Sequence, residues 1–203
     1  MHLPLCAQRQ RPGAEFDFAA AARRVKAAGY DGVEIHSAHG YLLNQFYSPI
    51  SNRREDSYTG ETIEGRTRLH CQVISAVREA VGPDFLVALR LGACDYQEGG
   101  STQADAVAAC KIFEAAGIDL LDISGGLCGY RGDGSKIPGY FGNESQAIRE
   151  AVSVPVILTG GVRTGLAAET LLEEGKADLI GVGRSVLKDS SWAKKAFVEL
   201  GIE

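Results

Sequence analysis

The sequence lacks the features that mark secreted, membrane-spanning or zinc-binding proteins. Its five cysteines are an odd count without a C-x-x-C pair, which argues against a disulfide framework and against a zinc site. No stretch approaches the ~20 apolar residues that a membrane-spanning helix requires, and the first residues lack the charged start and apolar run of a secretory signal. We therefore expect reduced cysteines and a cytoplasmic protein.

The sequence also has fewer basic than acidic residues. The 21 lysines and arginines are outnumbered by 26 acidic residues, so the formal net charge is -5 and the isoelectric point is near 5.5. Binding to nucleic acid or to an anionic membrane by charge requires a clustered positive surface that neutralises phosphate. We expect neither partner, and a small molecule is the better candidate for a ligand.

A short pattern that occurs three times is the first indication of architecture. The copies lie at residues 27–35, 115–123 and 174–182, and in each a glycine is followed by an aspartate and then by an apolar run. The glycine can adopt the left-handed conformation that closes a helix, and the apolar run suits a strand buried on both faces. Each copy therefore predicts a helix that leads directly into a buried strand.

Helices and strands are predicted to alternate along the chain. Five strands are expected near residues 32–36, 85–91, 120–124, 155–159 and 179–183, with helices over Phe16–Ala28, Arg66–Val81 and Ser191–Leu200. Helix ends are marked by Gly82, Gly117 and Gly175, and helix starts by Thr164 and Ser190. This alternation is typical of right-handed βαβ units and a parallel sheet, so the predicted fold class is α/β. A doubly wound sheet can be complete with five strands, whereas a closed barrel needs eight and typically ~250 residues.

The first predicted strand runs directly into three chemically distinctive residues, His36, His39 and Tyr41. Loops after the strands build the site in parallel α/β folds, so two imidazoles at this spacing can turn toward one point and donate to a single oxygen atom. Tyr41 offers a phenolic proton from the same turn. A lone histidine is usually structural. A His-x-x-His pair also suits a metal, but catalytic zinc needs a third protein ligand that no later strand end supplies, so we predict no metal.

Later predicted strands end in residues suited to an anionic cofactor. These residues are Arg90 after the second strand, Gly160 and Gly161 after the fourth, and Gly183 and Arg184 after the fifth. Barrels of this kind commonly bind phosphate after their last two strands through backbone N–H groups. Each signal is weak by itself, because a strand-end arginine often forms a surface ion pair and a Gly-Gly pair is often only a turn. The glycine-rich run 125–134 is predicted to be a mobile loop over the site.

The run from Gly32 to Pro49, which contains the two histidines and the tyrosine, resembles the old yellow enzyme family of FMN-dependent ene-reductases, as does the run 52–58 that follows. The resemblance continues at residues 88–91, 121–124, 159–162 and 181–184 and reaches Trp192. It implies a TIM (β/α)8-barrel that is present only in part, with the five strands corresponding to about the fourth to the eighth. It also implies an irregular N-terminal segment at 1–13 and a partial barrel at 14–203 that holds FMN and substrate. Three positions depart from the family pattern, which usually has Gly, Asn and Ser at Thr59, Gly65 and Gly92.

The resemblance implies a role for each of the residues at the strand ends. His36 and His39 would hold the carbonyl oxygen of an α,β-unsaturated substrate, and Tyr41 would protonate its alkene carbon. Arg90 would lie beside the flavin ring. The FMN phosphate would be held by Gly160, Gly161, Gly183 and Arg184. The implied chemistry is reduction of a C=C bond in an enone-type small molecule, with FMN as cofactor and NAD(P)H as reductant.

An open sheet cut from a barrel would have two unpaired edges and an uncovered apolar interior, both of which favour association. We therefore expect self-association or a completing chain. The alternative function is a non-catalytic remnant that still binds FMN or phosphate through its glycine turns. A cofactor-free isomerase of a sugar phosphate would also use those turns, but it would leave His36, His39 and Tyr41 unexplained.

Overall fold

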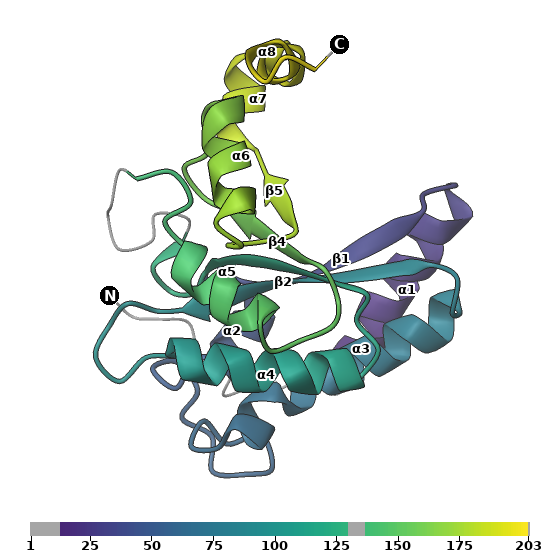
Figure 1. The fold of residues 1–203 in the computed structure, drawn as a ribbon. Helices are drawn as coiled ribbons and strands as arrows, with labels where there is room; N and C mark the ends of the chain where they lie inside the picture. Colours follow the sequence, from purple (N-terminus) through teal and green to yellow (C-terminus); the bar gives the residue numbers. More distant parts are fainter. Residues whose placement is uncertain (1–12, 130–136, 203) are drawn as a thin grey trace.

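A computed structural model describes residues 13–129 and 137–202 of the chain (Figure 1). Its centre is a parallel sheet whose strands follow one another in chain order. Their bounds are β1 Gly32–Ser37, β2 Leu86–Cys94, β3 Leu120–Gly125, β4 Val156–Thr159 and β5 Leu179–Gly181. The predicted α/β class and the five predicted strands are confirmed. Apart from Gly13, the predicted irregular segment at 1–13 lies outside the described residues, as does the 130–134 part of the glycine-rich run.

Helices connect the strands, and Figure 1 shows α1, α3, α4 and α5 on the same side of the sheet. The helices in the described residues are α1 Ala14–Ala27, α2 Leu42–Tyr47, α3 Ile63–Val81, α4 Gln103–Ala115, α5 Gly142–Arg149, α6 Gly165–Glu173, α7 Arg184–Lys188 and α8 Trp192–Glu199. The helices predicted at 16–28, 66–81 and 191–200 correspond to α1, α3 and α8. The helices α2, α5 and α7 have only 6, 8 and 5 residues, too few for an apolar period to identify them.

The predicted helix ends are confirmed within a residue, but α1 and α3 begin two and three residues earlier than predicted. Thr164 precedes α6, and its hydroxyl accepts a hydrogen bond from the Ala167 N–H at 3.2 Å. Ser191, rather than the predicted Ser190, precedes α8. A positive φ occurs at or just after a helix end at Gly82, Gly117 and Gly175. These glycines therefore end helices as predicted.

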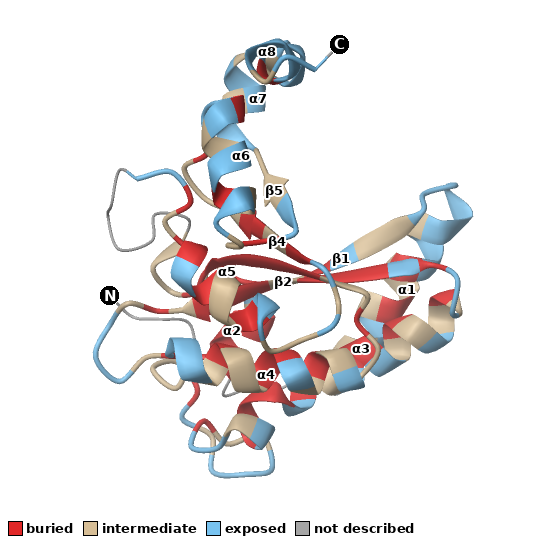
Figure 2. Cartoon of the chain, in the orientation of Figure 1, coloured by how far each residue is buried: buried red, intermediate tan, exposed pale blue. Residues whose placement is uncertain are grey.

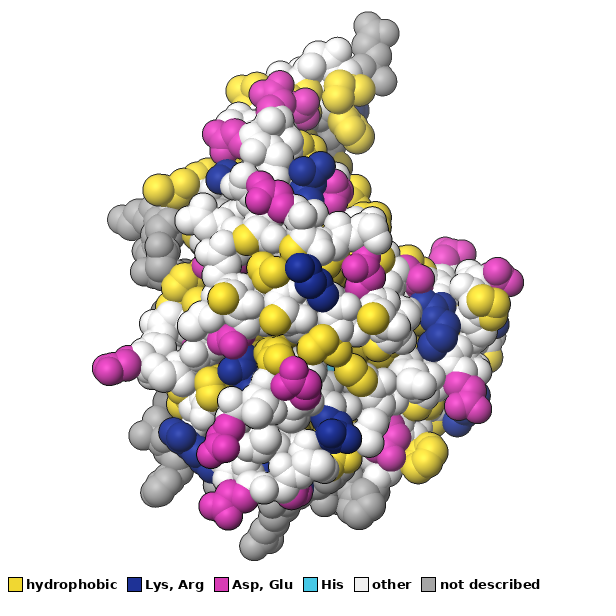
Figure 3. Space-filling view, turned by 60° about the horizontal axis from the view of Figure 1, so that its bottom comes forward, with side chains coloured by type: hydrophobic (Ala, Val, Ile, Leu, Met, Phe, Trp, Pro, Cys, Tyr) yellow, Lys and Arg dark blue, Asp and Glu magenta, His cyan; other side chains and the backbone are white. Residues whose placement is uncertain are grey.

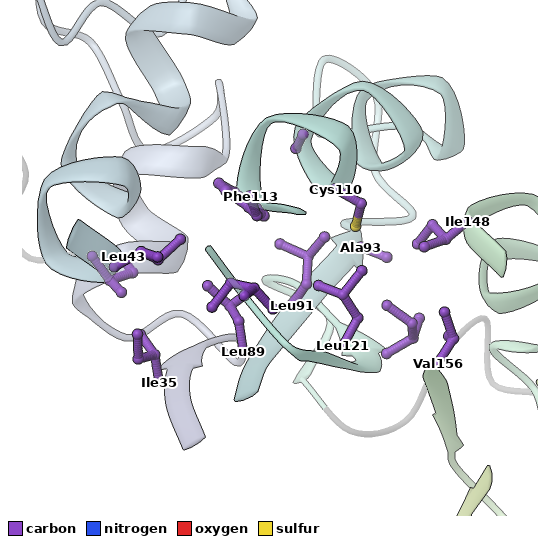
Figure 4. Packing of buried hydrophobic residues seen from close by; sticks show 14 of the residues in the cluster. Ile35, Leu43, Leu89, Leu91, Ala93, Cys110, Phe113, Leu121, Ile148 and Val156 are labelled. Carbon is purple, nitrogen blue, oxygen red and sulfur yellow. The ribbon is translucent and has the colours of Figure 1, made fainter. Parts of the chain in front are cut away.

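Successive side chains of a strand point to opposite faces of the sheet, as in β2. In β2, Val87, Leu89 and Leu91 are fully buried, and they join the main apolar core with helix residues such as Phe113 of α4 (Figures 2 and 4). Burial of apolar surface of this kind stabilises a fold by roughly 25 cal/mol per Å². Arg90, between two of these residues, points to the other face. The core therefore lies between the helices and one face of the sheet.

Within the described residues, the opposite face of the sheet is only partly covered and both edges are unpaired. Leu86 and Leu179 point to this face and are 44% and 49% exposed. No other described strand pairs with the outer edge of β1 or of β5. Val186, Leu187 and Val198, on α7 and α8 beyond β5, are also exposed. Unpaired edges and apolar side chains of this kind favour association with another polypeptide segment.

Charges of both signs are spread over the surface. In the view of Figure 3, Lys and Arg side chains lie among Asp and Glu side chains, with apolar side chains between them. This face therefore carries no large patch of a single sign. In the described parts of the chain, no helix is long and apolar enough to cross a membrane.

Two of the departures from the family pattern lie against each other. A Cβ atom at Gly65 would come within 2.4 Å of the Thr59 carbonyl oxygen and 2.7 Å of the Thr59 methyl group. Gly65 leaves the space that Thr59 occupies, so the two departures form one local change. At Gly92, a Cβ atom would lie 2.6 Å from the Cα atom of Gly126, so this close backbone approach requires glycine.

The aspartate of the recurring pattern fixes the start of its strand to the preceding strand. The Asp119 N–H donates to the Val87 carbonyl at 3.0 Å, and the Asp119 carboxylate accepts from the Val87 N–H at 2.8 Å. Asp178 makes the same two bonds with Val156, each at 2.9 Å. The recurring sequence pattern therefore ends a helix and also pairs the following strand with the strand before it.

We expect Asp119→Ala to destabilise the chain by about 1–3 kcal/mol, because the Val87 N–H loses its acceptor and Arg78 loses its charged partner. Urea unfolding followed by circular dichroism measures the change. Asp84→Ala is the control, since Asp84 is an exposed residue before β2 and should change the stability by less than about 0.5 kcal/mol. Equal effects of the two substitutions would contradict the role of Asp119.

Candidate active site

The three residues predicted to bind and protonate substrate lie together at the carboxyl end of β1. The ring centroids of His36 and His39 are 5.3 Å apart, and the Tyr41 ring lies 5.4 Å from that of His36. His39 has a left-handed φ of 60°, which turns the chain just after the strand. Tyr41 directly precedes α2 and is 64% exposed. The structure therefore brings two imidazoles and a phenol into one cluster.

Both imidazoles are neutral at pH 7. Burial lowers the pKa of His36, and the positive charge of Arg90 lowers it further. Burial, Arg90 and, to a smaller extent, His36 lower the pKa of His39 to about 4. A neutral imidazole carries one N–H donor and one acceptor nitrogen. Each histidine can therefore donate one hydrogen bond to a substrate oxygen without carrying a positive charge.

Ser124, at the end of β3, orients His39. The His39 Nε2 atom lies 2.8 Å from the Ser124 hydroxyl oxygen, and Ser124 is almost fully buried. When the hydroxyl donates this bond, the imidazole proton resides on Nδ1, and that nitrogen becomes the donor. Ser124 is not among the site residues predicted from the sequence. Its place at the carboxyl end of a strand is the signal that could have identified it.

Arg90 connects this cluster with the centre of the sheet. Parallel pairing places Arg90 between His36 on β1 and Asp122 on β3, on the same face. The Arg90 Nε atom lies 3.4 Å from Asp122 Oδ2, and its Nη2 atom lies 3.5 Å from the Thr159 hydroxyl oxygen. Thr159 itself donates to the Ile123 carbonyl at 2.7 Å. Groups from two strands therefore position the guanidinium.

Asp122 is a buried carboxyl beside this arginine. Burial raises the pKa of Asp122, the Arg90 charge opposes the rise and the Glu34 carboxyl adds to it, so that the pKa is about 7. Glu34 lies on the edge strand β1 and is more exposed than Asp122. The exposed carboxyl is the easier one to ionise, so the proton resides on Asp122. The charge beside Arg90 therefore changes near neutral pH.

A pocket of about 1000 Å³ lies at the carboxyl ends of β2 to β5. This volume is at the upper end of the range of roughly 300–1,000 Å³ found for small-molecule sites. Its lining contains every residue predicted to hold the cofactor, namely Arg90, Gly160, Gly161, Gly183 and Arg184. The structure therefore brings the predicted cofactor residues together in one place.

The pocket suits a phosphate-bearing cofactor such as FMN. Gly160 and Gly161 have φ values of 117° and 73°, a backbone conformation that favours glycine. A Cβ atom at Gly183 would meet no atom within 4 Å, so there is open space beside this turn. The Arg184 guanidinium follows the turn and donates to the Tyr140 hydroxyl at 2.8 Å. Backbone N–H groups at glycine turns together with a guanidinium form the donor set that a phosphate dianion requires.

Sequence reasoning missed several residues that line this pocket. Arg163 and Lys188 add two cations, and Trp192 donates from Nε1 to the Arg163 carbonyl at 2.7 Å. Arg163 follows the glycine turn after β4, so its position near a strand end could have identified it as a residue of the pocket. Tyr140 lies against the Gly160 and Gly161 turn, but it comes from the long connection between β3 and α5, where the sequence offers no such signal.

The predicted substrate residues lie beside the pocket and not in its lining. Arg90 and Ser124 line the pocket, while Arg90 pairs in register with His36 and Ser124 contacts His39. The predicted cofactor and substrate residues therefore form two adjacent groups joined by Arg90 and Ser124. In the 13–129 and 137–202 ranges, no group of three or more His, Cys, Asp or Glu side chains could hold a metal ion.

His70 is the remaining described histidine, and it has a structural position inside α3. Its Nε2 atom lies 2.7 Å from the Ser37 hydroxyl oxygen, and its ring stacks on Phe113 at a centroid distance of 5.1 Å. Burial lowers its pKa to about 3. His70 therefore links β1 to the helical layer as a neutral residue.

A parallel α/β sheet with a phosphate-suited pocket at the carboxyl ends of its strands is the arrangement of a cofactor-dependent barrel enzyme. Residues 15–202 match the NADH:flavin oxidoreductase / NADH oxidase family, and the chain belongs to this family. The predicted old yellow enzyme type is thereby confirmed. FMN as the family's cofactor and NAD(P)H as its reductant are confirmed as well.

Curated relatives include proteins of two different lengths. The chain is 43% identical over 184 residues to the NADPH dehydrogenase of Bacillus licheniformis, a match that covers 90% of this chain and 53% of the relative. It is 39% identical over 184 residues to a metal reductase of Desulforamulus reducens, covering 88% of this chain and 27% of that protein. The chain thus spans about half of the first relative and about a quarter of the second.

Solved structures of flavoenzymes share the fold. A 2-naphthoyl-CoA reductase in complex with 2-naphthoyl-CoA superposes with a TM-score of 0.82 at 29% identity, over 93% of this chain and 29% of the other. Morphinone reductase in complex with tetrahydroNAD superposes with a TM-score of 0.74 at 28% identity, over 95% of this chain and 50% of the other. These neighbours are TIM-barrel flavoenzymes, so the prediction of a barrel present in part is confirmed.

Asp122→Asn tests the buried carboxyl. Because the folded-state pKa of Asp122 is raised, its contribution to stability is fully present below the unfolded pKa of about 3.9 and is lost as the pH rises to about 7. We expect the urea midpoint of the wild type to fall relative to that of D122N over this range.

Glu34→Gln is the matched second variant for this measurement. Since the Glu34 carboxyl raises the pKa of Asp122, its removal should make the pH-dependent loss of stability smaller. A constant difference between the wild type and D122N across the whole range would contradict the protonation of Asp122.

Proposed function

We propose that this chain carries the flavin-binding and substrate-binding residues of an FMN-dependent oxidoreductase that uses NAD(P)H to reduce the C=C bond of α,β-unsaturated carbonyl compounds. The observation that carries the proposal is the position of two neutral histidines and a tyrosine beside a pocket with glycine turns and an arginine. Membership of the flavin oxidoreductase family supports it. So do the names of two structural neighbours, which are reductases.

His36 and His39 would stabilise the substrate carbonyl during reduction. Both are neutral N–H donors, and a hydrogen bond to the carbonyl oxygen strengthens as negative charge develops there. The exposed Tyr41 hydroxyl would deliver a proton to the alkene carbon next to the carbonyl. One hydride and one proton are thereby added across the double bond.

FMN, when bound, supplies the hydride that it has received from NAD(P)H. Its phosphate would be held by Gly160, Gly161, Gly183 and Arg184. Arg90, positioned by Asp122 at 3.4 Å, would face the electron-rich edge of the flavin ring and oppose negative charge on it. The chain itself therefore provides the anion site, the positive charge at the ring and the proton donor.

A non-catalytic FMN-binding or phosphate-binding remnant is the alternative. It is favoured by one observation, since the phosphate-suited pocket is formed without His36, His39 or Tyr41 in its lining. Such a protein would bind FMN but would not pass electrons to an enone. The two functions therefore differ in a single measurable step.

We also propose that a further polypeptide segment completes the barrel. The unpaired edges of β1 and β5, in the part of the chain that the structure describes, support this. So does the chain's coverage of only 53% of the NADPH dehydrogenase. The segment would belong to a longer parent chain, a second copy or another protein. A cytoplasmic location stays a prediction from the sequence.

Titration with FMN, followed by flavin fluorescence, tests the cofactor site. We expect saturable binding by the chain and at least roughly tenfold weaker binding by Arg184→Ala, because a charge-assisted contact to the phosphate is lost. The double variant H36A/H39A should keep the wild-type affinity, since neither residue lines the pocket. Equal affinity of R184A and the wild type would contradict the phosphate site, and no binding by the wild type would contradict a cofactor site in this chain.

Anaerobic reduction with NADPH, followed by addition of cyclohexenone, tests the catalytic step. We expect Tyr41→Phe to slow re-oxidation of the flavin by the enone by roughly 10²–10⁴-fold, because the general acid is lost. The rate of flavin reduction by NADPH should be unchanged in this variant. Flavin that NADPH reduces but the enone cannot re-oxidise in the wild type would favour the remnant instead.

A further inference from the structure

The recurring aspartate pattern forms the same bonded unit at two places in the sheet. Asp119, at the start of β3, exchanges two hydrogen bonds with Val87 of β2, at 3.0 and 2.8 Å. Asp178, at the start of β5, exchanges two with Val156 of β4, at 2.9 Å each. In both cases the aspartate N–H donates to the carbonyl of the preceding strand and its carboxylate accepts from the N–H of the same residue.

Each unit also contains an arginine from the helix that precedes the earlier strand. Arg78 of α3 lies 2.5 Å from the Asp119 carboxylate, and Arg149 of α5 lies 2.7 Å from the Asp178 carboxylate. The helix α3 leads into β2, and α5 leads into β4. Each aspartate therefore joins its own strand to the preceding strand and to the helix that leads into that preceding strand.

Asp31 is the aspartate of the third copy, at the start of β1. Its carbonyl accepts from the Leu86 N–H at 3.0 Å, on the side of β2. Among the described residues, neither its N–H nor its carboxylate has a hydrogen-bond or ion-pair partner, and the residue is exposed. None of the bonds that define the unit at Asp119 and Asp178 is therefore formed at Asp31, which lies on the outer edge of β1.

An exposed aromatic side chain lies beside Asp31. Tyr30 directly precedes it in the chain and is 67% exposed. An exposed aromatic side chain next to an unpaired strand edge indicates a surface that a neighbouring element covers.

We propose that Asp31 docks a helix–strand segment whose strand pairs in parallel with the outer edge of β1. The Asp31 N–H and carboxylate would bond one residue of that strand, and the carboxylate would pair with an arginine or lysine of the helix before it. The occupant is the preceding part of a barrel of this family, so the inference rests on the proposed completion of the barrel. Since a shift of one residue would exchange the two faces of the added strand, Asp31 also fixes its register.

The probe is the part of the Bacillus licheniformis NADPH dehydrogenase that lies outside the region matched by this chain. Isothermal titration calorimetry without FMN measures its association with the wild-type chain. We expect association, and a loss of roughly tenfold or more in affinity for Asp31→Ala, because charge-assisted hydrogen bonds and an ion pair are removed. Asp84→Ala is the control and should bind the probe like the wild type.

The isolated chain supplies a second readout, which separates docking from folding. Because the Asp31 side chain has no partner among the described residues, D31A alone should unfold at the same urea concentration as the wild type, whereas D119A should unfold earlier. Equal affinity of D31A and the wild type for the probe overturns the proposal, and so does the absence of association. Since flavin is absent from both measurements, failure of FMN binding would contradict the proposed function and leave this result standing.

Discussion

The register of the parallel strands is the constraint on which the rest of the structure depends. It places His36, Arg90 and Asp122 side by side on one face of the sheet. The same register sends Leu89 and Leu91 of β2 into the core against the helices. A slip of one residue would exchange the two faces, burying the arginine and exposing the leucines. Core packing therefore holds the site in position, and two core residues, Phe141 and Val162, also line the pocket.

Burial and the Arg90 charge together set the electrostatics of this face. Burial first, and the Arg90 charge second, keep the pKa values of His36 and His39 low. The same charge opposes the rise that burial causes in the pKa of Asp122. Because the same guanidinium lines the pocket, the affinity for an anionic ligand there would depend on the protonation state of Asp122. The chemistry of the pocket and that of the histidine cluster are therefore coupled through one side chain.

The sequence predicted well what depends on local pattern. Apolar runs, three of which follow a glycine and an aspartate, predicted the five strands. The residues at the strand ends predicted the cofactor group that the structure brings together. The end of β5 was predicted two residues late, at 183 instead of Gly181, because the run stays compatible with a strand up to the glycine turn. Tyr140 was missed because it reaches the site through tertiary contacts from a long connection, whereas Ser124 was missed although it stands at the carboxyl end of a strand. The recurrence of the aspartate was visible in the sequence, but its bonds to the preceding strand were not, since they join residues 22 to 32 positions apart.

A crystal structure of the chain with FMN, alone or with its completing segment, tests the central claim most directly. We expect the phosphate within hydrogen-bond distance of the backbone N–H groups at Gly160, Gly161 and Gly183 and of the Arg184 guanidinium, with the flavin ring beside Arg90. The free face of the flavin ring would then lie toward His36 and His39. A phosphate bound outside the glycine turns, or a ring remote from Arg90, would contradict the assignment of this pocket as the flavin site.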